Sequence, residues 1–158
     1  MNHNILITYP EKCDGCMECE TACLAKHGCE DHPEKSRIRV THFHGDDFFM
    51  PVACNHCENA PCIKTCPKEA ISIGDSPGRV SINYAKCVGC SMCVFSCPFG
   101  AMKFDGEKGR PFKCDLCGGD PQCVAHCKPK ALAFAAPEML QYPGAIKAAQ
   151  HFYKRKRP

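Results

Sequence analysis

Cysteine dominates the residues of this sequence that could do chemistry. The 158-residue chain contains 17, and all but Cys29 fall into four groups of four. The spacers within a group are short, so its sulfur atoms can gather around metal. Thiolates are soft ligands that bind zinc and iron–sulfur clusters. Group one is Cys13, Cys16, Cys19 and Cys23; group two is Cys54, Cys57, Cys62 and Cys66; group three is Cys87, Cys90, Cys93 and Cys97; group four is Cys114, Cys117, Cys123 and Cys127.

The spacing within the groups favours iron–sulfur clusters. Group three reads C-x2-C-x2-C-x3-C followed by Pro98, which is the pattern of bacterial [4Fe–4S] ferredoxins. In two-cluster proteins of that kind, the fourth cysteine of the run binds the neighbouring cluster. Groups two and four have a longer loop before their third cysteine, and such a loop can lengthen without displacing the sulfur atoms. The sequence therefore predicts four [4Fe–4S] clusters.

Structural zinc is the main alternative for these cysteines. Zinc sites pair C-x2-C knuckles across long spacers, whereas here three cysteines follow one another closely and the run recurs. Zinc or a three-iron cluster at a single site is a narrower alternative. A disulfide framework is disfavoured, because the number of cysteines is odd and residues 1–10 lack the features of a signal peptide.

The remaining composition argues against several other classes of protein. No apolar run approaches the ~18 residues that span a bilayer, so we expect no direct membrane insertion. Oxygen-sensitive clusters favour a cytoplasmic location in an anaerobic cell. The bare chain has a formal charge of +3, but the thiolates and oxidised cluster cores would bring it to about −5. Its basic pI therefore gives no reason to expect nucleic-acid binding. No nucleotide-binding glycine motif or catalytic constellation is present, so we expect no enzymatic activity of its own.

Three of the groups end in one repeated pattern. A cysteine (Cys66, Cys97 or Cys127) is followed by three residues, an alanine, and two apolar residues on either side of one other residue. This alternation predicts a short strand after each group. We also expect a strand at residues 5–8, leading into group one, and a C-terminal helix at residues 145–153. Two β-hairpins are expected, one pairing residues 37–41 with 48–52 and the other pairing residues 70–72 with 80–83.

Three histidines and one cysteine lie near the groups without belonging to them. Because each group already supplies four thiolates, His27, His56 and His126 are not needed as ligands. We expect these histidines beside the metal centres, where they could tune a potential, or on the surface. Cys29 is expected to be a bystander rather than a ligand.

The motifs resemble those of a known family. The stretches Cys54-Asn-His-Cys-Glu-Asn-Ala-Pro-Cys62, Cys97-Pro-Phe-Gly100 and Lys113-Cys-Asp-Leu-Cys117 are similar to the four-cluster ferredoxin subunits of the dimethyl-sulfoxide-reductase type. The resemblance implies crossed ligation, in which the fourth cysteine of each run binds the cluster of a partner group. Set A would be Cys13, Cys16, Cys19 and Cys127; set B Cys114, Cys117, Cys123 and Cys23; set C Cys54, Cys57, Cys62 and Cys97; set D Cys87, Cys90, Cys93 and Cys66.

The resemblance also implies an α+β fold of two ferredoxin-like dicluster modules, one nested within the other in sequence. Short hairpins and helical turns would build residues 1–35 with 105–136 into one module, and residues 36–104 into the inserted module. Residues 137–158 would form a docking or solvated tail with a helix. The sequence departs from the family pattern at two places that affect loop shape. Proline follows Cys66 and Cys97, but none follows Cys23 or Cys127.

The function implied is that of an electron-transfer subunit with a catalytic oxidoreductase partner. The short loop from Cys117 to Cys123 resembles the compact subunits that serve tungsten aldehyde oxidoreductases, so we favour a tungsten or molybdenum pterin enzyme. A second redox subunit or a ferredoxin could be a further partner. The alternatives are a free polyferredoxin that carries electrons between enzymes, or a subunit of a hydrogenase, formate dehydrogenase or carbon monoxide dehydrogenase.

Overall fold

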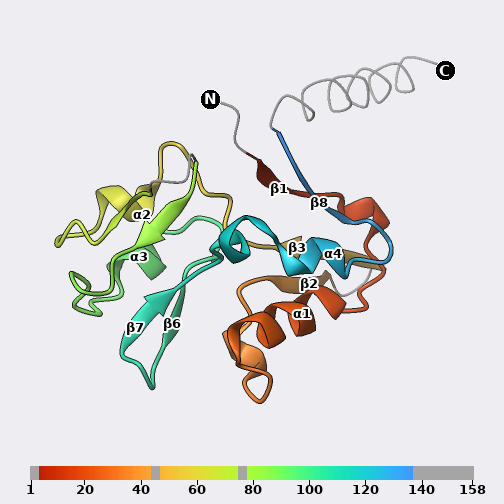
Figure 1. The fold of residues 1–158 in the computed structure, drawn as a ribbon, viewed down its shortest axis with the longest axis horizontal. Helices are drawn as coiled ribbons and strands as arrows, with labels where there is room; N and C mark the ends of the chain where they lie inside the picture. The colour runs from red at the N-terminus through yellow and green to blue at the C-terminus, as the bar shows by residue number, and fades with distance from the viewer. Residues whose placement is uncertain (1–3, 44–46, 75–77, 137–158) are drawn as a thin grey trace.

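The computed structural model describes residues 4–43, 47–74 and 78–136 (Figure 1). Short helices and small antiparallel sheets make up this part of the chain, in agreement with the α+β class. The helix predicted at 145–153 and the tail 137–158 lie outside the described residues. The helices are α1 (Glu18–His27), α2 (Pro61–Lys64), α3 (Met92–Phe95) and α4 (Gln122–Ala125), with 3-10 turns at Pro10–Lys12, Pro33–Lys35 and Leu116–Gly119.

The described strands form four two-stranded antiparallel sheets. One sheet joins segments that are far apart in sequence: Ile5 in its first strand lies opposite Ala135 in its last. This pairing brings group one, which follows the first strand, beside group four, which precedes the last (Figure 1). The pairs are β1 (Ile5–Thr8) with β8 (Leu132–Ala135), β2 (Arg39–Phe43) with β3 (Phe48–Val52), β4 (Ile71–Ile73) with β5 (Val80–Ile82), and β6 (Lys103–Asp105) with β7 (Arg110–Phe112).

The predicted strands and hairpins are confirmed, with small shifts at their ends. The first strand has the predicted bounds, and β4, β6 and β8 follow the three repeated patterns. The hairpin expected from residue 37 instead starts at Arg39. One reason is that Arg37 donates its N–H to Sγ of Cys23 at 3.3 Å and so does not pair with a strand.

Two separate clusters of buried side chains hold this architecture together. The first combines Ile38, Val40 and Ala53 with α1, α4 and β8, and the second lies around α2, α3 and the β4–β5 hairpin. Cys19, Cys23, Cys123 and Cys127 all belong to the first cluster, so metal bound there would complete the core. Val40 of the β2–β3 hairpin packs in the first cluster, whereas the hairpin falls within residues 36–104, the stretch predicted to form the inserted module.

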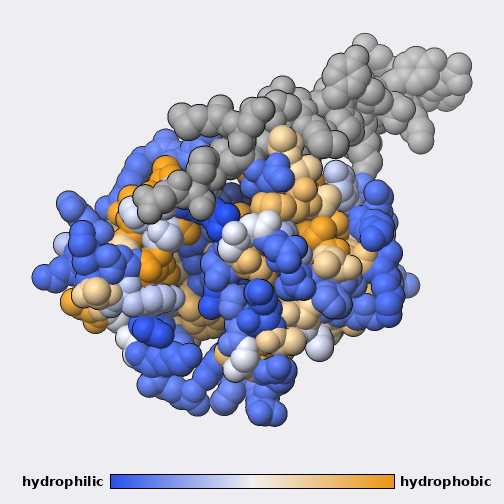
Figure 2. Space-filling model, viewed as in Figure 1, coloured by the Kyte–Doolittle hydropathy of each residue, from blue (hydrophilic) through white to orange (hydrophobic). Residues whose placement is uncertain are grey.

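The surface of the molecule is mainly polar. The face seen in Figure 2 is largely hydrophilic, with hydrophobic patches between the polar side chains. Among the described residues, no helix has the length and apolar character needed to cross a membrane.

Candidate metal centres

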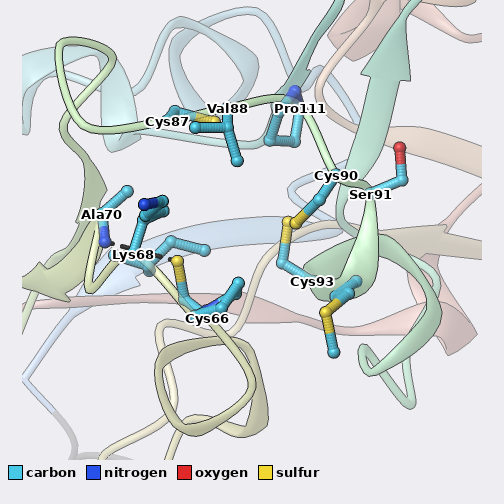
Figure 3. A pocket seen from close by; sticks show the side chains of 12 residues that line it. Cys66, Lys68, Ala70, Cys87, Val88, Cys90, Ser91, Cys93 and Pro111 are labelled. Carbon is cyan, nitrogen blue, oxygen red and sulfur yellow. Dashed lines mark hydrogen bonds between the residues drawn. The ribbon is translucent and has the colours of Figure 1, made fainter.

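Cysteines from different groups surround three cavities. One is lined by set D, so that Cys66 of group two faces the same space as the first three cysteines of group three (Figure 3). A second cavity is lined by set C, and a third by set B. In each case three cysteines come from one group and the fourth comes from its partner group. This is the combination that crossed ligation requires.

Three of the four set A cysteines gather where β1 leads into group one and group four leads into β8. Directly after β1, Tyr9 donates its N–H to the carbonyl oxygen of Ala131 at 2.7 Å. Cys19 and Cys127 belong to the first buried cluster, and the partly buried Cys13 packs against it. Cys16, the remaining member of the set, is exposed.

A left-handed residue precedes the second cysteine in every group. The residues are Gly15 (φ 75°), His56 (φ 47°), Gly89 (φ 69°) and Leu116 (φ 57°). Turns with a left-handed residue can direct backbone N–H groups toward one side, where they bind anionic centres. Glycine is required in group three, because a Cβ on Gly89 would lie 2.2 Å from the carbonyl oxygen of Gly109. The four groups thus share one backbone turn despite their different sequences.

The third cysteine of every group is the second residue of a helix. In groups one and three, the left-handed residues Met17 and Ser91 directly precede that helix. In groups two and four, whose loops are longer, Pro61 is the first residue of its helix and Pro121 directly precedes its helix. Proline suits the first position of α2 because its fixed φ is already helical and its missing N–H has no partner there anyway. The longer loops therefore leave the third cysteine in the same place on its helix.

Backbone N–H groups donate to several of the fourth cysteines. Ala70 donates to Sγ of Cys66 at 3.3 Å, and Ala131 donates to Sγ of Cys127 at 3.2 Å. These alanines occupy the repeated position of the internal pattern, and each is only 1% exposed. In these two copies, a small residue fits the buried site from which its N–H reaches the sulfur, and the third alanine, Ala101, is also buried. Cys23 has no such alanine because α1 continues past it to His27.

Burial changes the acidity of the cysteine thiols. It raises the pKa of Cys19 and of Cys114 to about 12, and that of Cys93 to about 11. Such thiols stay protonated at neutral pH in the metal-free chain. Binding of a metal centre must therefore displace their protons, and the positive charge of the metal replaces them.

Sulfur atoms of neighbouring sets also act on one another. After burial, Cys54 of set C is among the groups that raise the pKa of Cys114 in set B. In the same way Cys62 of set C acts on Cys93 of set D. Cys19 of set A likewise contributes to the raised pKa of Cys123 in set B, after the larger effect of burial. Sets A and B, sets B and C, and sets C and D are therefore close enough for their sulfur atoms to influence one another.

His56 is the histidine most closely built into the structure. It is 7% exposed, and its Nδ1 accepts the N–H of Val80 at 3.0 Å. Lys113, which is also buried, places Nζ 3.4 Å from the same nitrogen. Burial, followed by the positive charge of Lys113, lowers the pKa of His56 to about 3. No sequence pattern indicated this contact, because the two residues are far apart in the chain.

The other residues near the groups have simpler surroundings. His27 lines the set B cavity, with Nε2 lying 3.6 Å from the carboxylate of Asp115. These two side chains and Cys117 could together hold a metal ion, but Cys117 already belongs to set B. His126 is exposed. Cys29 lines none of the three cavities and donates its S–H to the carbonyl oxygen of His27 at 3.3 Å.

Known proteins share this arrangement of sequence and fold. The polyferredoxin-like subunit of an aliphatic sulfonate oxidoreductase from Pyrococcus furiosus is 43% identical over 124 residues, covering 78% of this chain and 70% of the relative. The thiosulfate reductase electron transfer subunit PhsB of Salmonella typhi is 33% identical over 150 residues, covering 84% and 76%. Among solved structures, the BamBC active site complex of benzoyl coenzyme A reductase contains a similar chain, with a TM-score of 0.51, 25% identity, and coverage of 86% of this chain and 78% of that one.

A family assignment follows from these matches. Residues 46–136 match the family described as a 4Fe-4S dicluster domain. This stretch contains groups two, three and four and makes up more than half of the chain. The chain therefore belongs to the 4Fe-4S dicluster family, as an iron–sulfur electron carrier with [4Fe–4S] clusters as its cofactors.

Proposed function

We propose that this chain is the electron-transfer subunit of an oxidoreductase complex, and that sets A, B, C and D each hold one [4Fe–4S] cluster. The observation that carries the proposal is the lining of three cavities by sets B, C and D, each with its fourth cysteine from another group. When bound, the clusters supply reversible one-electron transfer. The chemistry on a substrate would belong to the catalytic partner.

The order of the sets can be inferred from their shared surroundings. Cysteines of sets A and B pack in the first buried cluster, and cysteines of sets C and D pack in the second. Lys113 lines the set C cavity and directly precedes Cys114 of set B, so we infer that the four sets form a row in the order A, B, C, D. The two exposed cysteines support this order, since Cys16 belongs to set A and Cys90 to set D. Exposure at both ends suits electron exchange with one partner at each end.

The protein controls this exchange through its own groups. The N–H donors to Cys66 and Cys127 draw electron density from the thiolates, and Arg37 does the same for Cys23. Such hydrogen bonds raise a cluster's reduction potential, whereas burial opposes the added negative charge of reduction. Because the sets differ in these hydrogen bonds and in burial, we expect their clusters to differ in reduction potential.

The surface near set D suits a permanent partner. Val88, Met92 and Phe95 are 62%, 47% and 87% exposed, and the first two line the set D cavity. Exposed apolar groups of this size are typical of protein interfaces. We propose that a catalytic subunit covers them, and we favour a tungsten or molybdenum pterin enzyme of the aldehyde oxidoreductase type. The fold likeness to the benzoyl coenzyme A reductase complex supports this choice.

The remaining features complete the proposal. A second redox subunit or a ferredoxin would exchange electrons at Cys16 of set A. The two modules would be those predicted, with the β2–β3 hairpin packed on the module of sets A and B. We propose a cytoplasmic location, where oxygen-sensitive clusters are best protected in an anaerobic cell.

Anaerobic purification from the native source tests this function. We expect a second chain to copurify, with tungsten or molybdenum in stoichiometric amount, and its substrate to reduce the clusters of this chain within the complex. A chain that purifies alone with its full iron content would instead identify a free polyferredoxin. Nickel in the second chain would point to a hydrogenase or carbon monoxide dehydrogenase.

A further inference from the structure

Lys113 is a buried cation at the boundary between the two central sets. Its side chain is 5% exposed, and its Nζ donates to the carbonyl oxygen of Cys114 at 2.8 Å. In the part of the chain that the structure describes, no carboxylate forms an ion pair with this ammonium. A buried charge is costly unless an opposite charge compensates it. The compensating charge must therefore come from something else nearby.

Both central sets offer such a charge. Lys113 lines the cavity of set C, and it directly precedes Cys114 of set B. Its Nζ lies 3.4 Å from Nδ1 of His56, the residue directly before Cys57 of set C, and it also donates to the carbonyl oxygen of Cys114. The ammonium is thus placed beside two sets at once.

His56 keeps the ammonium in this position. Its Nδ1 faces two donors, the N–H of Val80 and the ammonium of Lys113, so the ring proton must lie on Nε2 and the ring is neutral. A neutral acceptor contacts the ammonium without cancelling its charge. His56 itself is fixed by the turn between Cys54 and Cys57, where its φ is 47°.

We propose that the Lys113 ammonium is the shared counter-charge of the two central clusters, in sets B and C, and that His56 holds it between them. The inference rests on the proposed function, since it requires clusters in both sets. Each cluster gains one negative charge when it accepts an electron, and the buried ammonium lies close to that added charge in both sets. Lys113 is thus a positioning residue that stabilises the reduced form at the centre of the row more than at its ends.

Potentials of the individual clusters test this role. In the Lys113→Gln variant of the full chain, loaded with clusters under anaerobic conditions, we expect two of the four midpoint potentials to fall. A tenfold change in the one-electron equilibrium, or about 59 mV, is the expected shift in an EPR-monitored redox titration. Lys113→Arg, which keeps the charge, should restore most of it. Lys108→Gln removes the same charge from an exposed site and should move no potential by a comparable amount.

Three outcomes decide the inference. Four clusters in the unsubstituted chain, with unmoved or equally shifted potentials in Lys113→Gln, would overturn it and leave the proposed function intact. Fewer than four clusters in the unsubstituted chain would overturn the proposed function itself. If Lys113→Gln fails to retain iron, the same potentials are measured in His56→Asn, which removes the ring proposed to hold the ammonium. Asparagine tolerates the left-handed backbone at this position, so this variant should fold. A smaller fall at the same two clusters supports the shared charge, and no fall overturns it.

Discussion

The same cysteine pattern occurs in both halves of the molecule, but the cysteines differ in burial. They are more buried around sets A and B than around sets C and D. Five of the eight cysteines in sets A and B are buried, whereas Cys93 is the one buried cysteine in sets C and D. The reason lies in the elements around them. Helix α1 has 10 residues and packs against α4, while α2 and α3 have 4 residues each. The ligand motif thus fixes the turn around a centre, and the surrounding elements fix its environment.

The largest contrast should come from removing a ligand in each half. Cys123→Ala deletes a side chain that is 6% exposed and lies in the first buried cluster. We expect loss of one cluster and partial unfolding of α4 and β8, because cluster binding and folding are coupled. Cys90→Ala, at an exposed ligand of set D, should lose one cluster but keep the secondary structure. Iron content and far-UV circular dichroism measure both effects, and equal unfolding in the two variants would contradict the contrast.

A smaller effect should follow from filling the space at the repeated alanine. Ala131→Leu places extra atoms in a site that is 1% exposed beside Cys127. Overpacking of this kind costs about 1–3 kcal/mol, so the apparent midpoint of anaerobic urea denaturation should fall. Ala85→Leu, at an exposed alanine, is the matched control. An unchanged midpoint in Ala131→Leu would mean that the repeat does not depend on a small side chain.

The anchor of α1 can be tested separately. Glu20 is 7% exposed and accepts the N–H of Val40 at 2.7 Å and Nη1 of Arg39 at 2.8 Å, which ties α1 to β2. Because a buried hydrogen bond to a charged group contributes about 1.5–3 kcal/mol, Glu20→Ala should destabilise the half around sets A and B. The clusters of sets C and D should keep their EPR signals. Glu18→Ala, which removes the exposed ion pair with Lys128, should have no measurable effect on stability.

The apolar surface near set D should matter least for the fold. Phe95→Asp changes a side chain that is 87% exposed, so iron content and stability should stay as they are. Copurification of the catalytic chain should weaken, because a charge replaces an apolar contact at the proposed interface. Phe104→Asp, at another exposed phenylalanine on the β6–β7 hairpin, is the control. Equal binding by both variants and the unsubstituted chain would place the interface elsewhere.

The sequence predicted the repeated features of this fold better than its individual contacts. Strands after Cys66, Cys97 and Cys127 could be found because the alternating pattern recurs in the chain. The packing of the β2–β3 hairpin against the first buried cluster could not be predicted. Val40 and Ala53 are ordinary apolar residues, and nothing in the sequence indicates which cluster they will join. The contact between His56 and Lys113 was missed for the same reason: long-range pairing of polar side chains leaves no periodic signal. The buried alanines were visible in the repeat, but their role required the hydrogen bonds to sulfur.

The most direct test of the account is the iron content of paired ligand variants. Cys13→Ala and Cys127→Ala, from groups one and four, should each lose one cluster, or about four irons. Because set A joins these two cysteines, the double variant should lose no more iron than either single variant. Losses that add up to about eight irons in the double variant would show that the two cysteines serve different clusters, and would contradict crossed ligation.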